Sequence, residues 1–514
     1  MPGSSFNLDV LSALTAAGAV SVPWEEALGV PHDLIVTASP KGGLGMLQGP
    51  QVLLPHGAGF NKALIHEGTP TLPSGLDPAY LLEDGLPRAR YALAHGSQLA
   101  RLAQLSPPAA ARASVVGDPM AERLLASASR RESFREALGT GDRSLVVLAS
   151  TWGPRSLLSL RPELAHELTA LLPYDEYQFA LIAHPNMRSA EGTFELHRLL
   201  APALRAGLVL ADPREEWASM LLAADVVISD HGSTALYGAL AGCPVLRALP
   251  GDEMCAELVL GTPMHRLLHS APHVRSAGDL PDVLAAHEST LAEQQGAAVH
   301  DAFDSRQSAL AGLRALLYSE LELVPPHEGP YVLPLPLPEI SVQRRPGVFG
   351  VRTELTGDLL VVERSPSPVA AVDAHHLAAE FGLATESEMT GAGVIYRRRQ
   401  PLAALGGSRW TAGGWTSQIL LDYPACRTAA VILSPERVVL RRRRSAPVMA
   451  RVRRVDQHGR VYRPDPAAVL SAAHAWLARQ ADPQLPTQLV CVVGRRSYSL
   501  ELTPACPSDM DEET

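Results

Sequence analysis

The sequence predicts an α/β protein made of two Rossmann-like domains, followed by an α+β domain. From residue 6 to about residue 250, helical patterns alternate with short apolar runs, as in parallel sheets wound with helices. A Gly-Asp-Pro turn at 117–119 divides this alternation, and a proline-rich stretch follows it near residue 330. At 514 residues and 46% hydrophobic content, the chain is long enough to bury two or three cores.

Short apolar runs mark the predicted strands of the first two domains. Runs this apolar are usually covered on both faces of a sheet. The predicted strands are 33–39, 51–54, 91–94, 114–116, 144–149, 179–182, 208–210, 226–228 and 245–246. A helical pattern at 8–17 comes almost at once, so the first domain is expected to lack its opening strand, or the true start lies upstream. Further helices are expected at 121–138 and 234–240.

The predicted boundaries follow these patterns and the prolines. We expect a first Rossmann-like domain at 1–120, a second at 121–324, a stiff linker at 325–340, an arginine-rich α+β domain at 341–508 and a disordered acidic tail at 509–514. In the α+β domain, strands are expected at 358–363, 429–433, 438–440 and 488–493, with helices at 373–381 and 466–481.

Charge and cysteine content limit the class of protein. The net charge of −10 divides into −14 for residues 1–334 (22 basic, 36 acidic) and +4 for residues 335–514 (22 basic, 18 acidic). The five cysteines lack C-x-x-C spacing, so neither a zinc site nor a disulfide framework is indicated. No apolar run reaches the roughly 18–20 residues of a membrane span. We expect a cytoplasmic protein whose membrane association, if any, is peripheral.

The first candidate loop follows the predicted strand 51–54. His56 can accept a proton near neutral pH, and Lys62 can neutralise a phosphate. Gly57 and Gly59 permit close backbone approach. The structural alternative is a histidine packed at a strand end, with glycines that only make a turn.

Two more loops follow predicted strands of the second domain. Ser150, Thr151 and Arg155 follow strand 144–149, where hydroxyls and a guanidinium suit phosphate oxygens. Trp152 fits a base-stacking or a core role equally well. His184 ends the next strand, and the proline after it favours an extended backbone that projects the ring.

The last candidate is the turn between strand 226–228 and helix 234–240. It contains Asp230, His231, Gly232, Ser233 and Thr234. Such a turn places free helix amides and hydroxyls beside a glycine, an arrangement that suits a donor phosphate. An ordinary capped helix without ligand is the alternative.

Together these segments resemble the CDP-glycerol glycerophosphotransferase family, which has the two-domain GT-B glycosyltransferase fold. The matching motifs lie within about residues 30–250: Leu54-Pro-His-Gly57 with Lys62, Ser150-Thr-Trp152, His184-Pro185, Asp230 with Ser233, and Gly242-x-Pro244. Relatives usually have a basic residue where Ile182-Ala183 stands, and an Asp-Tyr-Ser-Ser turn in place of Asp230-His-Gly-Ser233. In this second difference, the turn Asp230-His-Gly-Ser233 is partly similar to the Asp-Ser-Gly-Gly turn of UDP-N-acetylglucosamine 2-epimerase.

The resemblance implies a nucleotide-diphosphate donor on the second domain and an acceptor hydroxyl on the first. His56 is then the expected base, without a metal or cofactor. Glycerol phosphate, polyol phosphate or a sugar is the expected transferred unit. The expected donor and phosphate contacts are Lys62, Ser150, Thr151, Arg155, His184, Asp230, His231, Gly232, Ser233 and Thr234.

Two other functions stay open. One is a 2-epimerase acting on UDP-N-acetylglucosamine. The other is an inactive GT-B scaffold whose third domain binds a polyanion or a partner through the arginine runs 397–399, 441–444 and 451–454. A solvated strand face in an arginine-rich sequence explains those arginines better than a polyanion site, because a net charge of +4 is small for a polyanion-binding domain. His375-His376 with Glu380 could lie on one turn of the predicted helix 373–381, but no further ligand is evident, so no metal is expected.

Overall fold

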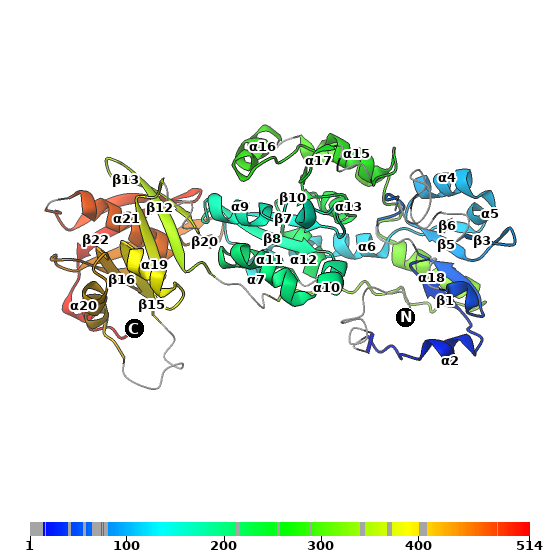
Figure 1. Ribbon diagram of the computed structural model, residues 1–514, viewed down its shortest axis with the longest axis horizontal. Helices are drawn as coiled ribbons and strands as arrows, with labels where there is room; N and C mark the ends of the chain where they lie inside the picture. Colours follow the sequence, from blue (N-terminus) through cyan, green and yellow to red (C-terminus); the bar gives the residue numbers. More distant parts are fainter. Residues whose placement is uncertain are drawn as a thin grey trace.

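A computed structural model shows three α/β regions in a row along the long axis of the molecule, with the first at one end and the third at the other (Figure 1). Two parallel sheets form the first two regions, and a closed sheet forms the third. The structure describes residues 14–15, 17–39, 43–54, 58–63, 73, 76, 81–211, 216–251, 253, 257–287, 290–339, 345–366, 373–399, 409–480 and 482–514.

The first sheet has four parallel strands in the order β1-β2-β5-β6. Its strands are β1 (Ile35–Thr37), β2 (Gln51–Leu53), β5 (Arg90–Leu93) and β6 (Ala113–Val115). Around it lie α2 (Trp24–Leu28), α4 (Gly96–Leu105), α5 (Pro107–Ala110) and the hairpin of β3 (Leu82–Glu83) and β4 (Leu86–Pro87). The helix expected at 8–17 lies almost entirely outside the described residues.

A helix from much later in the chain covers one face of this first sheet. In α18 (Ala309–Glu320), Leu316 packs with Val52 and Ala92 of the sheet. The carboxylate of Glu320 lies 3.7 Å from Arg90 and 3.5 Å from Arg112. The chain therefore returns to the first domain after it has formed the second, and α18 lies beside β1 (Figure 1).

The second sheet has five parallel strands in the order β11-β10-β7-β8-β9. They are β7 (Ser144–Ser150), β8 (Tyr177–Ala183), β9 (Val209–Leu210), β10 (Val226–Ser229) and β11 (Val245–Arg247). The residues of β7, β8 and β10 are all buried, because helices cover both faces. All the runs predicted as strands in the first two domains are confirmed.

Helices surround this second sheet. The helix predicted at 234–240 is confirmed as α13. The helix expected at 121–138 is interrupted by a short 3₁₀ turn, η2 (Ala128–Arg130), and therefore forms two helices. The helices are α6 (Pro119–Ala126), α7 (Arg131–Ala137), α8 (Leu157–Leu160), α9 (Leu164–Leu171), α10 (Pro185–Glu191), α11 (Thr193–Arg205), α12 (Glu216–Ala223), α13 (Thr234–Leu240), α15 (Pro263–Ser270), α16 (Leu280–His287) and α17 (Leu291–His300).

The strand order places a topological switch point between β7 and β10. From β7 the chain adds β8 and β9 on one side, and it then returns to add β10 and β11 on the other. The loops after β7 and β10 therefore diverge at the carboxyl edge of the sheet. Open α/β sheets bind their ligands at such an edge.

The third region is a closed sheet of nine strands around a central helix. The order is β12-β13-β21-β22-β18-β17-β16-β15-β14, and β14 pairs with β12 to close the ring. Eleven of the 14 residues of α21 (Pro466–Arg479) are buried, and many of them are alanines, which fit inside a narrow ring. The sequence analysis predicted four of these nine strands and the central helix, but it did not predict that the sheet closes.

The bounds of the third region are as follows. Its ring strands are β12 (Val348–Thr356), β13 (Leu359–Ser365), β14 (His376–Glu380), β15 (Val394–Arg398), β16 (Thr428–Ser434), β17 (Arg437–Arg442), β18 (Val448–Val452), β21 (Thr487–Val493) and β22 (Arg496–Pro504). Outside the ring are the hairpin of β19 (Val455–Gln457) and β20 (Arg460–Tyr462) and the helices α19 (Glu386–Gly391), α20 (Ala412–Asp422) and α22 (Pro507–Met510).

One predicted helix of this region is wrong, because residues 376–380 form the strand β14. Its backbone pairs antiparallel with β12 and parallel with β15. Ladder pairing on both sides overrides the local helical pattern. His375 Nδ1 accepts a hydrogen bond from the Thr353 amide, and the carboxylate of Glu380 pairs with Arg398.

The expectation of a disordered acidic tail at 509–514 is also wrong. The tail begins within α22, and Asp509 is buried where it pairs with Arg437 at 2.8 Å. Glu512 pairs with Arg399 and Arg437, and Glu513 pairs with Arg409. Basic partners on the ring and beside α20 thus order a segment whose composition alone favours disorder.

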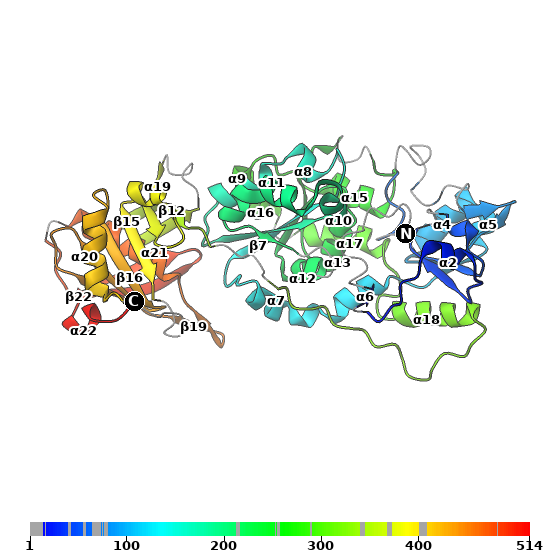
Figure 2. The same cartoon turned by 60° about the horizontal axis from the view of Figure 1, so that its bottom comes forward.

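The proline-rich linker is extended and packs along the second domain. Leu335 is buried in the main core of that domain, and its amide donates to Ser127 Oγ. Arg123 and Arg130 donate to carbonyls of the same stretch. Figure 2 shows this segment running from α18 past α6 and α7 to the third region.

Helices of the described part of the chain lack the combination of length and apolar character that a membrane span needs. Four described cysteines are free thiols: Cys243, Cys426 and Cys491 are buried, and Cys506 is exposed.

Candidate functional site

The predicted polar loops meet at the carboxyl edge of the second sheet. The Thr151 amide, after β7, donates to Asp230 Oδ2, after β10, at 2.9 Å. The rings of Trp152 and His184, which follow β7 and β8, have centroids 6.3 Å apart. The structure thus brings together residues from three neighbouring strand ends at the switch point.

Asp230 holds two of these loops by accepting backbone hydrogen bonds. Its Oδ2 accepts from the amides of Thr151 (2.9 Å) and Leu157 (2.8 Å), and its Oδ1 accepts from the Gly232 amide (3.0 Å). The side chain is fully buried; burial raises its pKa, while the amide bonds oppose that shift. Both carboxylate oxygens are therefore occupied by the loop backbone.

Ser150 plays a similar local part at the end of β7. Its hydroxyl accepts from the Leu158 amide at 3.2 Å and donates to the Thr151 carbonyl at 3.0 Å, and the residue is buried. The His184 amide donates to the Ser150 carbonyl at 3.0 Å, which ties the ends of β7 and β8 together. Ser150 and Asp230 are thus buried residues that hold the backbone of the loops at this edge of the sheet.

Other predicted residues present their groups at the surface of this edge. Gly232, Ser233 and Thr234 are half-buried, and Ser233 makes no side-chain bond to cap α13. Arg155 is half-buried and makes no hydrogen bond or ion pair with the described residues. Trp152 is 43% exposed. Hydroxyls, a guanidinium and an indole are thus accessible beside the switch point.

The protonation of His184 follows from its backbone contact. It lies just before α10, and its Nδ1 accepts a hydrogen bond from the Asn186 amide at 3.1 Å. A neutral imidazole that accepts at Nδ1 carries its proton on Nε2. His184 is therefore a hydrogen-bond donor through Nε2 at this edge.

Lys62 and His231 meet at a residue that the sequence patterns did not single out. Lys62 Nζ lies 3.0 Å from Glu257 Oε2, and His231 Nε2 lies 3.1 Å from the same oxygen. The hydrogen bond with His231, aided by Lys62, lowers the pKa of Glu257 to about 2. Glu257 stands in a stretch without a motif, so only tertiary packing reveals the contact.

His56, the expected base, lies outside the described residues, as does Gly57. The described remainder of its loop, residues 58–63, reaches the second domain. The Ala63 amide donates to the Glu257 carbonyl at 3.0 Å, and the Val259 amide donates to the Asn61 carbonyl at 2.9 Å. The loop that follows β2 thus joins the two domains.

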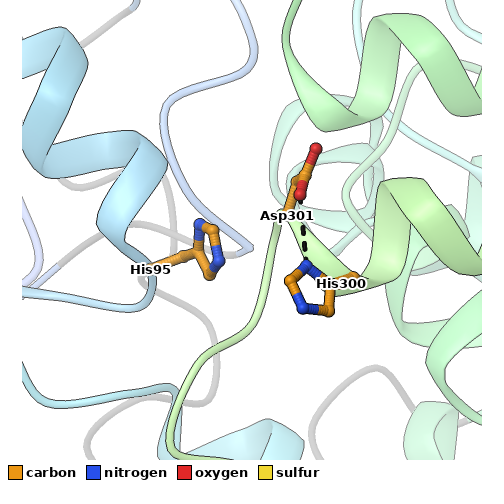
Figure 3. Close-up of side chains that lie close together, drawn as sticks. All are labelled: His95, His300 and Asp301. Carbon is orange, nitrogen blue, oxygen red and sulfur yellow. Dashed lines mark hydrogen bonds and ion pairs between the residues drawn. The ribbon is translucent and has the colours of Figure 1, made fainter.

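A cluster of metal-ligand types lies elsewhere, between α4 and α17 (Figure 3). Atoms of His95, His300 and Asp301 lie within 4.8 Å of one another. His95 Nδ1 accepts from the Ser97 amide at 2.9 Å, so the neutral ring carries its proton on Nε2, where a metal would have to bind. Asp301 is already paired with Arg266 at 2.6 Å. The donor set fits a hydrogen-bonded junction better than a metal.

The arginine runs of the third region are largely bonded within the protein. Arg398 pairs with Glu380 and Asp465, and Arg442 and Arg443 donate to backbone carbonyls. These contacts favour a structural role for the runs 397–399 and 441–443.

Comparisons with known proteins give matches among solved structures alone. No protein-family model matches the chain, and no curated protein matches it. The H548A variant of the wall teichoic acid polymerase TagF is 15% identical, with a TM-score of 0.41, over 56% of this chain and 73% of that chain. Alr3699/HepE of Anabaena, in complex with UDP and glucose, is 15% identical, with a TM-score of 0.34, over 62% of this chain and 84% of that chain.

Proposed function

We propose that this chain is a GT-B transferase that moves a glycerol-phosphate, polyol-phosphate or sugar unit from a nucleotide-diphosphate donor to a hydroxyl acceptor. The observation that carries the proposal is the convergence of three polar loops at the switch point between β7 and β10. Open α/β sheets bind nucleotides at this place, whatever reaction they catalyse.

The accessible groups at this edge suit a diphosphate. Arg155 supplies a cation without a protein partner among the described residues, and Ser233 and Thr234 supply hydroxyls. Such donors stabilise the negative charge that develops on a leaving nucleotide phosphate. Asp230 adds little repulsion, because backbone amides surround its carboxylate.

His56 is the proposed general base for the acceptor hydroxyl. Its loop begins at the carboxyl end of β2, and residues 61–63 of that loop pair with residues 257–259 of the second domain. Proton removal by a histidine in the transition state contributes typically 10²- to 10⁴-fold to a rate.

Calorimetry with CDP-glycerol, UDP-glucose and UDP-N-acetylglucosamine tests the proposal. We expect at least one donor to bind with a Kd below about 1 mM. Arg155→Met should weaken that donor roughly tenfold or more, since a charge-assisted bond is lost. The matched control is Arg275→Met, which removes an exposed arginine of the same domain outside the three loops. The transferase proposal is wrong if no donor binds in this range.

Turnover separates the proposed base from the donor contacts. His56→Ala should abolish transfer to the acceptor while donor affinity stays within about twofold. Unchanged turnover would remove His56 from the mechanism. Conversion of UDP-N-acetylglucosamine to its epimer without any acceptor would identify an epimerase instead.

A further inference from the structure

Lys62, Glu257 and His231 form a three-residue contact, here called the Glu257 bridge. One carboxylate oxygen of Glu257 lies 3.0 Å from the ammonium of Lys62 and 3.1 Å from Nε2 of His231. Lys62 comes from the loop after β2, and His231 comes from the turn after β10. The bridge therefore joins the first domain to the turn that we assign to the donor.

Backbone pairing holds Lys62 and Glu257, two of the three bridge residues, next to each other. Lys62 and Leu258 form an antiparallel pair, flanked by the hydrogen bonds of Ala63 with Glu257 and of Val259 with Asn61. A surface ion pair must order two mobile chains and is worth about 0–1 kcal/mol. Here the backbone already holds Lys62 and Glu257 next to each other, so less conformational entropy is lost.

The ring of His231 depends on Glu257 for its orientation. Its side chain is only 1% exposed, and neither ring nitrogen has another polar partner among the described residues. His231 stands between Asp230, which accepts three loop amides, and Gly232, the first accessible residue of the turn. A shift of this ring would therefore disturb the turn on both sides.

We propose that Glu257 is a positioning residue for the donor, which holds Lys62 and His231 as one unit at the turn 230–234. This inference rests on the proposed transferase function. Lys62 then affects donor binding through Glu257 and His231, and it does not act as an independent phosphate ligand. The loop that contains His56 is tied to the donor turn by the same contact.

A double-mutant cycle on donor affinity tests this unit. With the donor that the wild-type chain binds, Lys62→Met and His231→Asn should each raise Kd roughly tenfold. The Lys62→Met/His231→Asn double variant should raise Kd by about the same tenfold as either single variant, whereas independent ligands would give about hundredfold. In a Glu257→Gln background, either change should alter Kd by less than about twofold.

Arg155→Met provides the matched control for this cycle. Arg155 contacts none of the bridge residues, so its effect should multiply with that of Lys62→Met in both backgrounds. Independent, multiplicative effects of Lys62→Met and His231→Asn would overturn the proposal. Where Glu257→Gln fails to fold, the cycle in the wild-type background decides by itself. Absence of donor binding by the wild-type chain would instead remove the transferase function and this role together.

Discussion

The buried carboxylate of Asp230 accepts hydrogen bonds from three loop amides. Its replacement by asparagine therefore tests how much this side chain stabilises the two site loops. In Asp230→Asn, the remaining oxygen retains at best the bonds from Thr151 and Leu157. The new amide group then faces the Gly232 amide, donor against donor. The lost bond costs about 1–3 kcal/mol, and loss of the charge weakens the other two bonds by about 0.5–1 kcal/mol each. The loops should therefore lose roughly 2–5 kcal/mol.

Hydrogen exchange measures this loss where it occurs. The amides of Thr151, Leu157 and Gly232 should exchange at least roughly 30-fold faster in Asp230→Asn than in the wild-type chain. The matched control is Asp33→Asn, because Asp33 is exposed and makes no bond with the described residues. Unchanged protection of these three amides, with both chains folded, would refute the inference that Asp230 organises the two loops.

Two further predictions concern the third region. Burial lowers the pKa of His376 to about 3 and of His474 to about 4, whereas both titrate near 6.5 when unfolded. The unfolded chain thus takes up protons first as pH falls, and from about pH 6.5 towards 4 the region should lose about 3 kcal/mol at His474 alone. Urea unfolding against pH measures this, and a flat profile would contradict it. Arg364→Met removes a buried cation, leaves Asp175 without this partner and leaves Asp465 with Arg398, and it should cost about 3–5 kcal/mol; an unchanged urea midpoint would argue against that network.

The strands of the first two sheets are predictable from the sequence because each is covered on both faces. Burial of every position demands an uninterrupted apolar run, such as 144–149 or 226–228, and such a run stands out without any knowledge of its partners. The polar residues that follow these runs could be assigned to one edge for the same reason, since parallel strands end together.

Features that depend on distant partners could not be predicted. Residues 376–380 carry a helical pattern, and only pairing with β12 and β15 makes them a strand. Glu257 has no local motif, and its importance comes from Lys62 and His231, which distant parts of the chain bring to one of its carboxylate oxygens. The order of the acidic tail likewise depends on Arg399, Arg409 and Arg437.

The strand order of the closed ring has a consequence for biosynthesis. β21 and β22 lie between β13 and β18, so the ring stays open until the ribosome has made residue 504. The central helix α21 is synthesised before these two strands. Until β21 and β22 are made, part of the apolar surface of α21 is not covered by the sheet. Pairing across such long sequence separations is intrinsically slow. A nascent chain stalled before β21 should therefore bind hydrophobic-sensing chaperones, while its two Rossmann-like domains are already folded.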